Sequence, residues 1–542
     1  MLGQMQVQQL LISSLIEFAA ANHSDTEIVS RRVEGDIHRY TWADAASRSR
    51  QLANALDALG LSSDARVGTL AWNGYRHLEL YYGVSGTGRV VHTINPRLHH
   101  EQMAWIVNDA GDEALFFEIN FLHLAQQIRP LCPGVKHWVM LCDDEHLPAD
   151  HGIPGLASYE SLIRHRNTTY DWPTFDENTA AGLCYTSGTT GNPKGALYSH
   201  RSNILHAYAA VMPDAMCLSA RDAAMPVVPM FHVNAWGTPY SMAMIGCKVV
   251  FPGPNLDGKS LYELIDSEKV TFAAGVPTIW QMLLMHVQMN KLEFTHFKRT
   301  VIGGSACPPA MIDAFEQMGV TVIHAWGMTE LSPLGALSTL KAKHDQLPLA
   351  EQKRLLAKQG RPMFGVELKI VDAEGQARPH DGVAYGNLMA RGNWVVDRYF
   401  GFEESALSED GWFHTGDVAT IDADGYMQIT DRSKDVIKSG GEWISSIDIE
   451  NIAMGHPAVA MAACVGMPHP KWDERPVVVV ALKPGQQATR EELLAFYDGK
   501  IAKWQTPDDV VFVDEIPLGS TGKMLKNKVR DLLGDYKLPD LR

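Results

Sequence analysis

The chain contains 542 residues, of which 46% are hydrophobic and 20% are charged. This is the composition of an ordinary globular protein, and the length allows roughly two to four domains. The formal net charge of −16 argues against a nucleic-acid partner bound without sequence preference, because such binding needs a cationic face. A small anionic ligand is still compatible, since a local site can be positive on a negative protein.

The cysteines and the N-terminus bear on the location of the protein. The seven cysteines are odd in number and form no C-x-x-C pair, so we expect neither a disulfide framework nor a structural zinc site, and a reducing, cytoplasmic location. Residues 1–20 have no basic stretch, and Ser13, Ser14 and Glu17 interrupt their apolar run. They predict an amphipathic first helix rather than a signal peptide. No apolar run approaches the ~18 residues of a membrane span, so we expect no stable membrane insertion.

Through residue 330 the sequence alternates between helix and strand patterns. Residues 44–59 have helical periodicity and are followed by Gly60, a typical helix stop. We expect a second helix at 77–88 and buried strands at 65–73, 89–98, 113–118 and 137–142. Such alternation favours parallel sheets with helices on their faces.

Beyond residue 360 the pattern changes. Residues 366–379 predict a hairpin, and residues 426–432 predict a strand that follows a D-A-D-G turn. A new α+β pattern then begins, with helices expected near 446–455 and at 489–503 and strands at 458–466 and 476–483. The boundary at 431–441 carries paired glycines and alternating charges, which suit a hinge.

We therefore predict an α/β fold in two domains. Residues 1–431 would form a large N-terminal domain of stacked α/β sheets with a small β-barrel-like part, and residues 432–441 would form the hinge. Residues 442–542 would form a smaller, mobile α+β C-terminal domain, which has the size of a separate folding unit.

The stretch "YTSGTTGNPKG" (185–195) carries a clear functional signal. Its glycines let the backbone approach a ligand closely, its hydroxyls can donate hydrogen bonds, and Lys194 adds a positive charge. The combination predicts a phosphate-binding loop, although a lone glycine-rich run is more often a surface turn. Lys194 follows proline and precedes glycine, which excludes a Walker A loop, and no G-x-G-x-x-G opens a helix after a first strand.

This loop and four further motifs resemble those of the adenylate-forming superfamily, which includes acyl-CoA synthetases, luciferases and the adenylation domains of peptide synthetases. The other motifs are "HAWGMTE" (324–330), "GWFHTGD" (411–417), "DRSKDVIKSGGEWIS" (431–445) and "STGKMLK" (520–526). Together they span essentially the whole chain. The stretches "VVPMFHVNAWGTPY" and "IKSGGEWISS" are similar to those of bacterial medium-chain fatty-acyl-CoA ligases and of ligases that activate 3-methylmercaptopropionate.

The resemblance implies a reaction in two halves. A carboxylate first attacks the α-phosphate of ATP, giving an acyl-adenylate and pyrophosphate, and the thiol of coenzyme A then gives the thioester and AMP. The first half brings two anions together, so neutralising charge is a large part of what the site must supply. The implied partners are a small carboxylic acid, ATP and coenzyme A, with Mg²⁺ as cofactor, and similar enzymes imply a homodimer.

By the same resemblance, several motifs would hold ATP and AMP. Glu330 would bind Mg²⁺, which prefers oxygen ligands. Asp417 would bind the ribose diol with its two acceptor oxygens. Lys523 would bridge the carboxylate and the α-phosphate as the catalytic lysine, and Thr186 and His232 would assist it. The nucleotide-binding residues are Thr186, Ser187, Gly188, Thr189, Thr190, Gly191, Lys194, Gly303, Gly304, Ser305, His324, Trp326, Gly327, Met328, Thr329, Asp417, Arg432 and Lys523.

The acyl chain and coenzyme A would meet other residues. The acyl group would lie near His232, Trp236, Val276 and Trp326, with Trp236 as the candidate gate. Trp326 stands where most of the family has tyrosine, and it can still stack on adenine. Trp280 could also line the acyl pocket, and three tryptophans, Trp236, Trp280 and Trp326, indicate a restricted pocket for short-to-medium acids. The small domain would rotate about Lys434 between the two halves. Coenzyme A would then meet Lys438, Gly440, Gly441, Glu442 and Trp443.

Other interpretations stay open at this point. Taken singly, Glu330 and Lys523 could be solvated surface residues, Asp417 could belong to an Asx turn, and Trp236 could simply fill the core. The whole chain could instead load a carrier-protein thiol, stop at the acyl-adenylate, or bind acyl groups or nucleotides without catalysis. The acid is open between a fatty acid and 3-methylmercaptopropionate, an acid of dimethylsulfoniopropionate breakdown.

Overall fold

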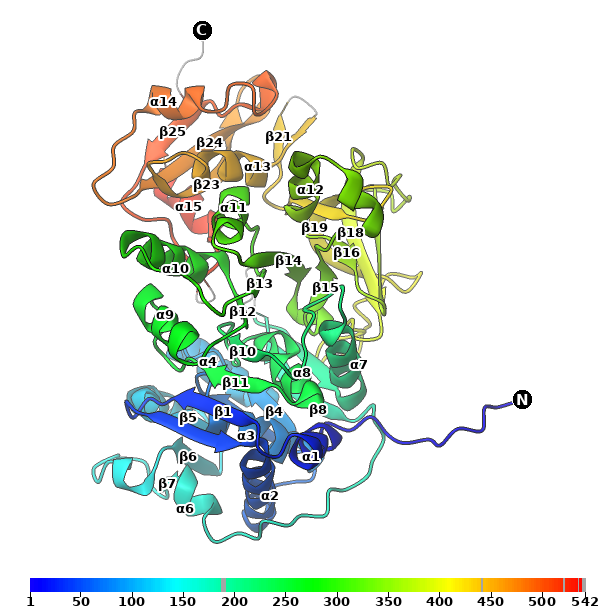
Figure 1. The fold of residues 1–542 in the computed structure, drawn as a ribbon, viewed down its shortest axis with the longest axis vertical. Coiled ribbons are helices and arrows are strands. Elements are labelled where there is room, and N and C mark those ends of the chain that lie inside the picture. Colours follow the sequence, from blue (N-terminus) through cyan, green and yellow to red (C-terminus); the bar gives the residue numbers. More distant parts are fainter. Residues whose placement is uncertain (187–191, 440–441, 520–521, 535, 539–542) are drawn as a thin grey trace.

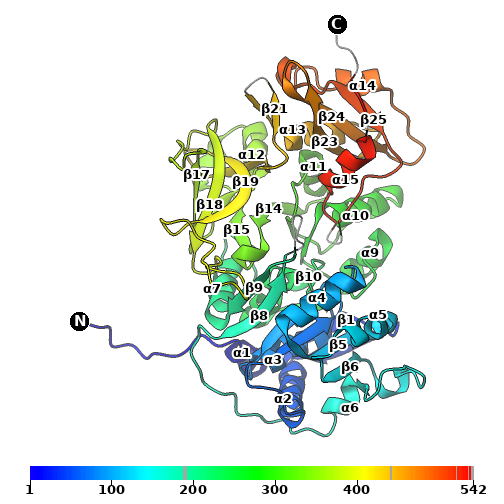
Figure 2. The same cartoon turned by 180° about the vertical axis from the view of Figure 1, so that it is seen from behind.

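Two helix-covered sheets make up most of the N-terminal part of the chain (Figures 1 and 2). The computed structural model describes residues 1–186, 192–439, 442–519, 522–534 and 536–538, with only the backbone described for Glu442 and Trp443. The first sheet has the strand order β7-β6-β5-β3-β4-β8-β9, in which β8 and β9 are antiparallel and the other neighbours parallel. Its strands are β3 (Arg66–Leu70), β4 (Val90–Thr93), β5 (Asp112–Glu118), β6 (His137–Leu141), β7 (Ala157–Ser158), β8 (Ala180–Tyr185) and β9 (Gly195–Ser199). The helices along this stretch are α2 (Trp42–Ala58), α3 (Tyr75–Ser85), α4 (His100–Ala110), α5 (Leu122–Ile128) and α6 (Tyr159–Ile163).

The second sheet has the order β16-β15-β14-β13-β12-β10-β11-β1-β2. Its inner strands are parallel, whereas β2, β15 and β16 run antiparallel to their neighbours. Its strands are β1 (Glu27–Arg31), β2 (Ile37–Thr41), β10 (Ala223–Pro226), β11 (Lys248–Phe251), β12 (Phe272–Gly275), β13 (Arg299–Ile302), β14 (Thr321–Gly327), β15 (Leu334–Leu337) and β16 (Arg361–Pro362). The helices along it are α1 (Ser13–Asn22), α7 (His200–Val211), α8 (Thr238–Ile245), α9 (Gly258–Ser267), α10 (Pro277–Met289), α11 (Pro309–Gln317) and α12 (Leu349–Leu356).

Helix α3 joins the two sheets. Every residue from Tyr75 to Ser85 is buried, and the helix contacts β4 of the first sheet as well as β1 of the second. A helix without a solvent face belongs to the interior of a domain. The two sheets therefore share one core, which confirms the stacked α/β arrangement expected from the sequence.

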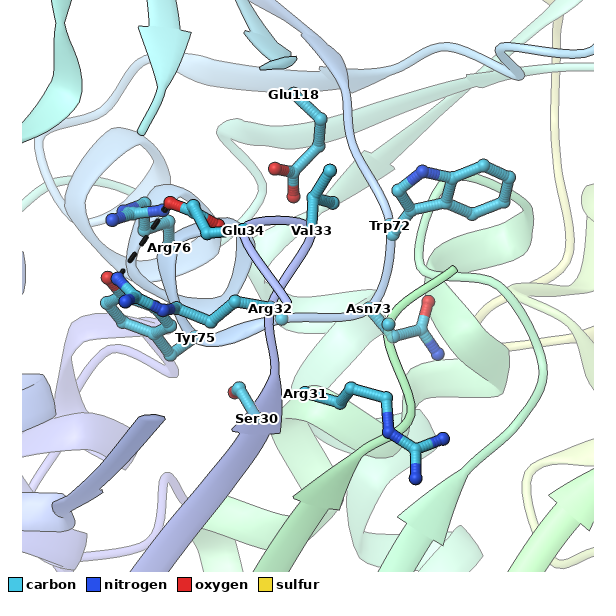
Figure 3. Close-up of a pocket in the computed structure, with 12 residues that line it drawn as sticks. Ser30, Arg31, Arg32, Val33, Glu34, Trp72, Asn73, Tyr75, Arg76 and Glu118 are labelled. Atoms are coloured by element: carbon cyan, nitrogen blue, oxygen red, sulfur yellow. Dashed lines mark hydrogen bonds and ion pairs between the residues drawn. The ribbon is translucent and has the colours of Figure 1, made fainter. Parts of the chain in front are cut away.

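A small polar cavity lies beside the start of α3, between the β1–β2 turn and the end of β5 (Figure 3). Glu34 accepts a hydrogen bond from Nη1 of Arg76 at 2.6 Å. Burial raises the pKa of Glu118, which borders the same cavity, to about 8. The volume of about 20 Å³ suits a single water molecule. This junction fixes the β1–β2 turn to α3 and is too small for a substrate.

Two smaller antiparallel or mixed sheets follow. The sheet β17-β18-β19-β20 is antiparallel and occupies the place of the expected barrel-like part. The C-terminal sheet has the order β22-β21-β24-β23, with β25 parallel to β24. Their strands are β17 (Val366–Val371), β18 (Tyr385–Gly392), β19 (Phe413–Ile421), β20 (Met427–Arg432), β21 (Ile437–Ser439), β22 (Glu442–Ile444), β23 (Val459–His469), β24 (Asp473–Leu482) and β25 (Asp509–Phe512). The C-terminal helices are α13 (Ser446–Met454), α14 (Arg490–Ala495) and α15 (Lys526–Leu533).

Most elements expected from the sequence are present, with shifted ends. The helix expected at 44–59 begins at Trp42, because Thr41 caps it and forms a capping box with Asp44. The hairpin expected at 366–379 is limited to the Val371–Ala377 bridge, and its first strand, β17, pairs instead with β18. The helix expected at 489–503 ends at Ala495.

The helix expected over residues 1–20 was wrong in its first half. It begins at Ser13, and residues 1–8 are exposed and lead away from the body of the protein (Figure 1). Burial starts at Leu11, so only from there does packing stabilise a helix that is too short to form by itself. Among the described residues, no helix is both long and apolar enough to cross a membrane.

Candidate functional site

Several of the predicted site residues line a cleft between the N-terminal sheets and the C-terminal domain. The parallel strands β12, β13 and β14 end side by side, and their carboxyl ends open onto this cleft, as is usual for ligand sites in open α/β sheets. The cavity has a volume of about 240 Å³. Residues from both sides line it, among them Thr278, Gly304, Trp326, Asp417 and Lys523.

Lys523 reaches the cleft from a tight loop of the C-terminal domain. Leu518 bridges Met524, and the Gly519 N–H donates to the Lys523 carbonyl at 2.7 Å, which holds the base of the loop. Gly522 has a φ of 79°, and a Cβ there would lie 2.8 Å from Thr278 Oγ1, so glycine lets the loop approach the larger domain. Burial, followed by repulsion from Arg432, lowers the pKa of Lys523 to about 8.

Gly303 and Gly304 form the opposite wall. A Cβ on Gly303 would lie 2.9 Å from the Ala325 carbonyl oxygen, so a side chain has no room there. A Cβ on Gly304 would lie 3.7 Å from Lys523 Cε. The loop after β13 therefore presents bare backbone directly beside the lysine, as close contact with a nucleotide requires.

Asp417 is a shared acceptor at the other side of the cleft. Its Oδ2 accepts from the Trp326 indole N–H at 2.8 Å, and Arg432 Nε lies 2.9 Å from its Oδ1. The Trp326 ring packs against Gly335 and Leu331. The indole is thus used to orient the carboxylate, a role that the sequence did not indicate.

Glu330 is buried beside the base of the 185–195 loop. Its Oε1 accepts from the Tyr399 hydroxyl at 2.8 Å, and within the described residues its Oε2 has no hydrogen-bond partner. The Lys194 ammonium lies 4.9 Å from the centre of the Tyr399 ring. Thr186 closes the loop by donating its N–H to the Lys194 carbonyl at 2.9 Å. Ser187, Gly188, Thr189, Thr190 and Gly191 lie outside the described residues.

Hydrogen bonds to the backbone hold several of the other residues that were predicted to bind the nucleotide. His324 accepts from the Cys307 N–H at Nε2 and donates from Nδ1 to the Ala357 carbonyl, so its ring connects the loop after β13 to the end of α12. The Thr329 carbonyl accepts from the Tyr198 hydroxyl at 2.6 Å. The Met328 N–H bonds to the Pro333 carbonyl, and a Cβ on Gly327 would clash with the same oxygen. Ser305 lines the cleft.

His232 precedes a strained turn that includes Trp236. Val233, Asn234, Ala235 and Trp236 all have φ between 47° and 59°, the left-handed region that L-residues rarely adopt in succession. The Val233 N–H bonds to Cys184 Sγ at 3.3 Å, and Gly237 completes the turn with φ 71°. The turn places the Trp236 ring over the glycine wall, because a Cβ added at Gly303 would lie 3.2 Å from this ring.

The environment of His232 sets its charge. Burial, followed by repulsion from Lys523, lowers the pKa of His232 to about 3. The imidazole is therefore neutral near pH 7, and it lies close enough to Lys523 for the charge of the lysine to lower its pKa. Val276 also lies against the glycine wall, because a Cβ added at Gly304 would come within 3.2 Å of its Cγ1. Trp280, also considered for the acyl pocket, packs instead against Phe297 and Phe315 in the core.

The residues predicted to meet coenzyme A lie away from the cleft. Lys438 is exposed on β21, which Figure 1 shows near α13 and away from β12 and β13. Gly440 and Gly441 lie outside the described residues, and nothing is described of the side chains of Glu442 and Trp443. The structure thus brings Lys523, but not the β21–β22 hairpin, to the glycine wall.

The sequence did not indicate Tyr399 or Thr278. Tyr399 bonds to Glu330 across 69 positions of the chain and lies in an irregular segment. Thr278 is the second residue of α10 and lies beside Gly522 of the C-terminal domain. Neither residue belongs to a motif, so only the tertiary structure could show them.

Two family models match the chain. The AMP-binding enzyme family covers residues 16–400, and the AMP-binding enzyme C-terminal domain covers residues 448–523. The chain therefore belongs to the AMP-binding enzymes, as the five motifs suggested.

Curated relatives and solved structures agree with this assignment. The chain is 56% identical to the 3-methylmercaptopropionyl-CoA ligase of Ruegeria lacuscaerulensis and 51% identical to the medium-chain-fatty-acid–CoA ligase of Ectopseudomonas oleovorans, over 99% of this chain in both cases and 99% and 98% of the relatives. It also resembles the crystal structure of an anthranilate CoA ligase in complex with anthranoyl-AMP, with a TM-score of 0.85, 25% identity and coverage of 96% and 97% of the two chains.

Proposed function

We propose that this protein is an AMP-forming acyl-CoA ligase in which Lys523 joins a carboxylic acid to ATP. The position of Lys523 carries the proposal: it lies against the glycine wall, next to His232, in the cleft that Asp417 also lines. An ammonium group at this place would bind the oxygens of the carboxylate and of the α-phosphate as they approach. Such charge neutralisation in a water-poor cleft is a strong form of catalysis.

The other residues would orient the reactants. Asp417, held by Trp326 and Arg432, would accept hydrogen bonds from the ribose hydroxyls. The 185–195 loop, of which the structure describes both ends, would bind the phosphates. Neutral His232 would donate or accept a hydrogen bond at the acid without adding charge.

Glu330 is the proposed ligand for Mg²⁺. Its carboxylate is 8% exposed, and one oxygen is held by Tyr399 while the other has no partner among the described residues. A half-used carboxylate near a phosphate loop fits a hard cation that keeps water and phosphate oxygens as its other ligands. When bound, the ion would neutralise part of the triphosphate charge.

The second half of the reaction would need another domain orientation. Lys523 occupies the cleft while Lys438 lies outside it. We propose that residues 442–542 rotate about Lys434 and bring the β21–β22 hairpin, with Gly440, Gly441, Glu442 and Trp443, to coenzyme A. The domain limits 1–431, 432–441 and 442–542 belong to this proposal.

The proposed acid is a short-to-medium fatty acid or 3-methylmercaptopropionate. Relatives that carry these activities in their names are 51% and 56% identical to the chain. Trp236 over the glycine wall favours a slender acyl chain. We also propose a cytoplasmic homodimer, in keeping with the unpaired thiols and with similar enzymes.

The test is AMP formation from each acid of a series, from propionate to palmitate and including 3-methylmercaptopropionate, with ATP and Mg²⁺ in the presence and absence of coenzyme A. We expect sustained AMP release that requires both acid and coenzyme A. Sustained release without coenzyme A would contradict the ligase, and failure of every acid would contradict the proposed substrate class. Neighbouring chain lengths should differ by only about fourfold in kcat/KM, since one methylene contributes ~0.8 kcal/mol.

A further inference from the structure

A largely buried cluster of charged side chains joins the two domains at the wall of the cleft, which its three members help to line. Asp431 is part of β20 and its side chain is 2% exposed, while Lys526 begins α15, three positions after Lys523, and its side chain is 12% exposed. The Lys526 ammonium lies 3.8 Å from Asp431 Oδ1 and 2.9 Å from Glu450 Oε1. One lysine of the C-terminal domain is thus shared between a carboxylate of its own domain and one of the other domain.

Asp431 also holds the first helix of the C-terminal domain. Its Oδ2 accepts from the Ser446 N–H at 3.0 Å, at the N-terminus of α13. Next to it, the Ser445 hydroxyl donates to the Thr430 carbonyl at 2.7 Å. A carboxylate at a helix N-terminus satisfies a free N–H and interacts favourably with the helix dipole. Three separate contacts therefore tie β20 to the C-terminal domain.

These contacts cross the proposed pivot. Asp431 precedes Lys434 and is fixed to β19 by the pairing of β20 with that strand. Ser446 and Lys526 follow Lys434. Rotation about Lys434 would therefore break the contacts of Asp431, whereas the ion pair of Asp435 with Arg530, at 2.9 Å, lies wholly after the pivot and would move as one unit.

We propose that Asp431 is a positioning residue that latches α13 and Lys526 to the N-terminal domain in the orientation that seats Lys523 in the cleft. This inference rests on the proposed function and adds to it the residue that favours the first half-reaction. In this proposal the latch acts by holding Lys523 in place and not by contact with the reacting atoms.

The contacts of Asp431 with Lys526 can break without leaving an unpaired buried charge. When Asp431 separates, its carboxylate can become hydrated, and Lys526 keeps Glu450 as a partner. No buried charge in this pair is then left alone, which is the costly outcome when an ion pair breaks. Because Lys526 starts the helix directly behind the Lys523 loop, the closed latch also fixes the base of that loop.

The test is Asp431→Asn in the full chain, with the two half-reactions measured separately. Acid-dependent pyrophosphate release measures adenylation, and transfer to coenzyme A from synthetic acyl-adenylate measures thioester formation. We expect adenylation to slow about tenfold, which corresponds to about 1.4 kcal/mol, and thioester formation to be unchanged or faster. Equal losses in both halves, or no loss in adenylation, would overturn the latch.

Controls separate this result from a loss of fold or of the proposed function. Arg530→Gln removes the ion pair that moves as one unit and should change both halves by less than twofold. Lys526→Arg keeps the charge and should keep the wild-type ratio of the two rates; Lys526→Gln should reproduce the effect of Asp431→Asn and replaces it if that variant fails to fold.

Trypsin should cut after Lys434 faster in Asp431→Asn than in Arg530→Gln, and equal cutting would also count against the latch. If wild type itself forms no acyl-CoA, the proposed function fails instead.

Discussion

At the scale of single residues, burial and neighbouring charges set the properties of the cleft. Lys523 and His232 lie close enough that the charge of the lysine lowers the pKa of the imidazole, and burial lowers the pKa of both. At pH 7 the lysine is charged and the histidine neutral. This combination of charges suits a site that must bind two anions, because the charged lysine lies next to a neutral hydrogen-bonding histidine.

Replacing Lys523 by alanine tests its role directly. We expect Lys523→Ala to lose at least about 100-fold in adenylation, since an ammonium on the reacting oxygens is lost. Thioester formation from synthetic acyl-adenylate should be nearly unchanged, because we propose that the hairpin with Lys438 serves that step. The measurement is the pair of half-reaction rates, and a comparable fall in both would refute the assignment.

The lowered pKa of Lys523 predicts a basic limb in the pH profile. In the free protein the ammonium loses its proton as the pH rises through about 8, so kcat/KM for ATP in adenylation should fall above that pH. Bound triphosphate favours the charged lysine, so kcat should fall only at higher pH. Lys523→Arg, if active, should lack the limb. A flat kcat/KM up to pH 10 in the wild type would show that Lys523 is not required in its charged form.

At the scale of elements, strand ends and two tight turns position the site. The ends of β12, β13 and β14 supply Val276, Gly303 and Gly327 at one edge of the sheet. The left-handed turn after His232 costs about 1–2 kcal/mol for each non-glycine residue and is held by Cys184 and the surrounding core. Strain of this kind persists only where the surroundings over-determine the backbone, which is common in ligand sites.

The hinge gives a prediction for the segment between the domains. Lys434 is exposed, and proline at this position would fix its φ and restrict Ser433 as well. We expect Lys434→Pro to impair thioester formation at least about tenfold more than adenylation, because the cleft already holds Lys523 without rotation. The two half-reaction rates are again the measurement, with Lys434→Ala as the control. Equal activity in both halves for the proline variant would exclude a pivot here.

At the scale of the whole molecule, the arrangement of domains selects one half of the proposed reaction. The C-terminal domain contributes Lys523 and Gly522 to the cleft, and its contacts with β20 fix that orientation. The β21–β22 hairpin then lies elsewhere (Figures 1 and 2). In the proposed mechanism one small domain would serve two steps, because Lys523 lines the cleft in this orientation while Lys438 lies outside it.

The amino-acid sequence by itself determined the α/β class, the alternation that builds the two sheets, and the family, because periodicity and motif residues are local properties. It predicted functional roles for Lys523, Glu330 and Asp417 for the same reason, and these roles stay predictions. It misjudged the start of α1 and the end of α14, where packing decides whether a short helix is stable.

Only the tertiary structure decided how these residues act together. That Trp326 orients Asp417, that Tyr399 holds Glu330, and that Asp431 meets Lys526 are contacts between segments 91, 69 and 95 positions apart, and no local pattern encodes them. The pKa values of Lys523 and His232 likewise depend on burial and on charges of residues distant in the sequence. The physical reason is that hydrogen bonding, ion pairing and desolvation depend on distance in space, whereas the sequence fixes distance only along the chain.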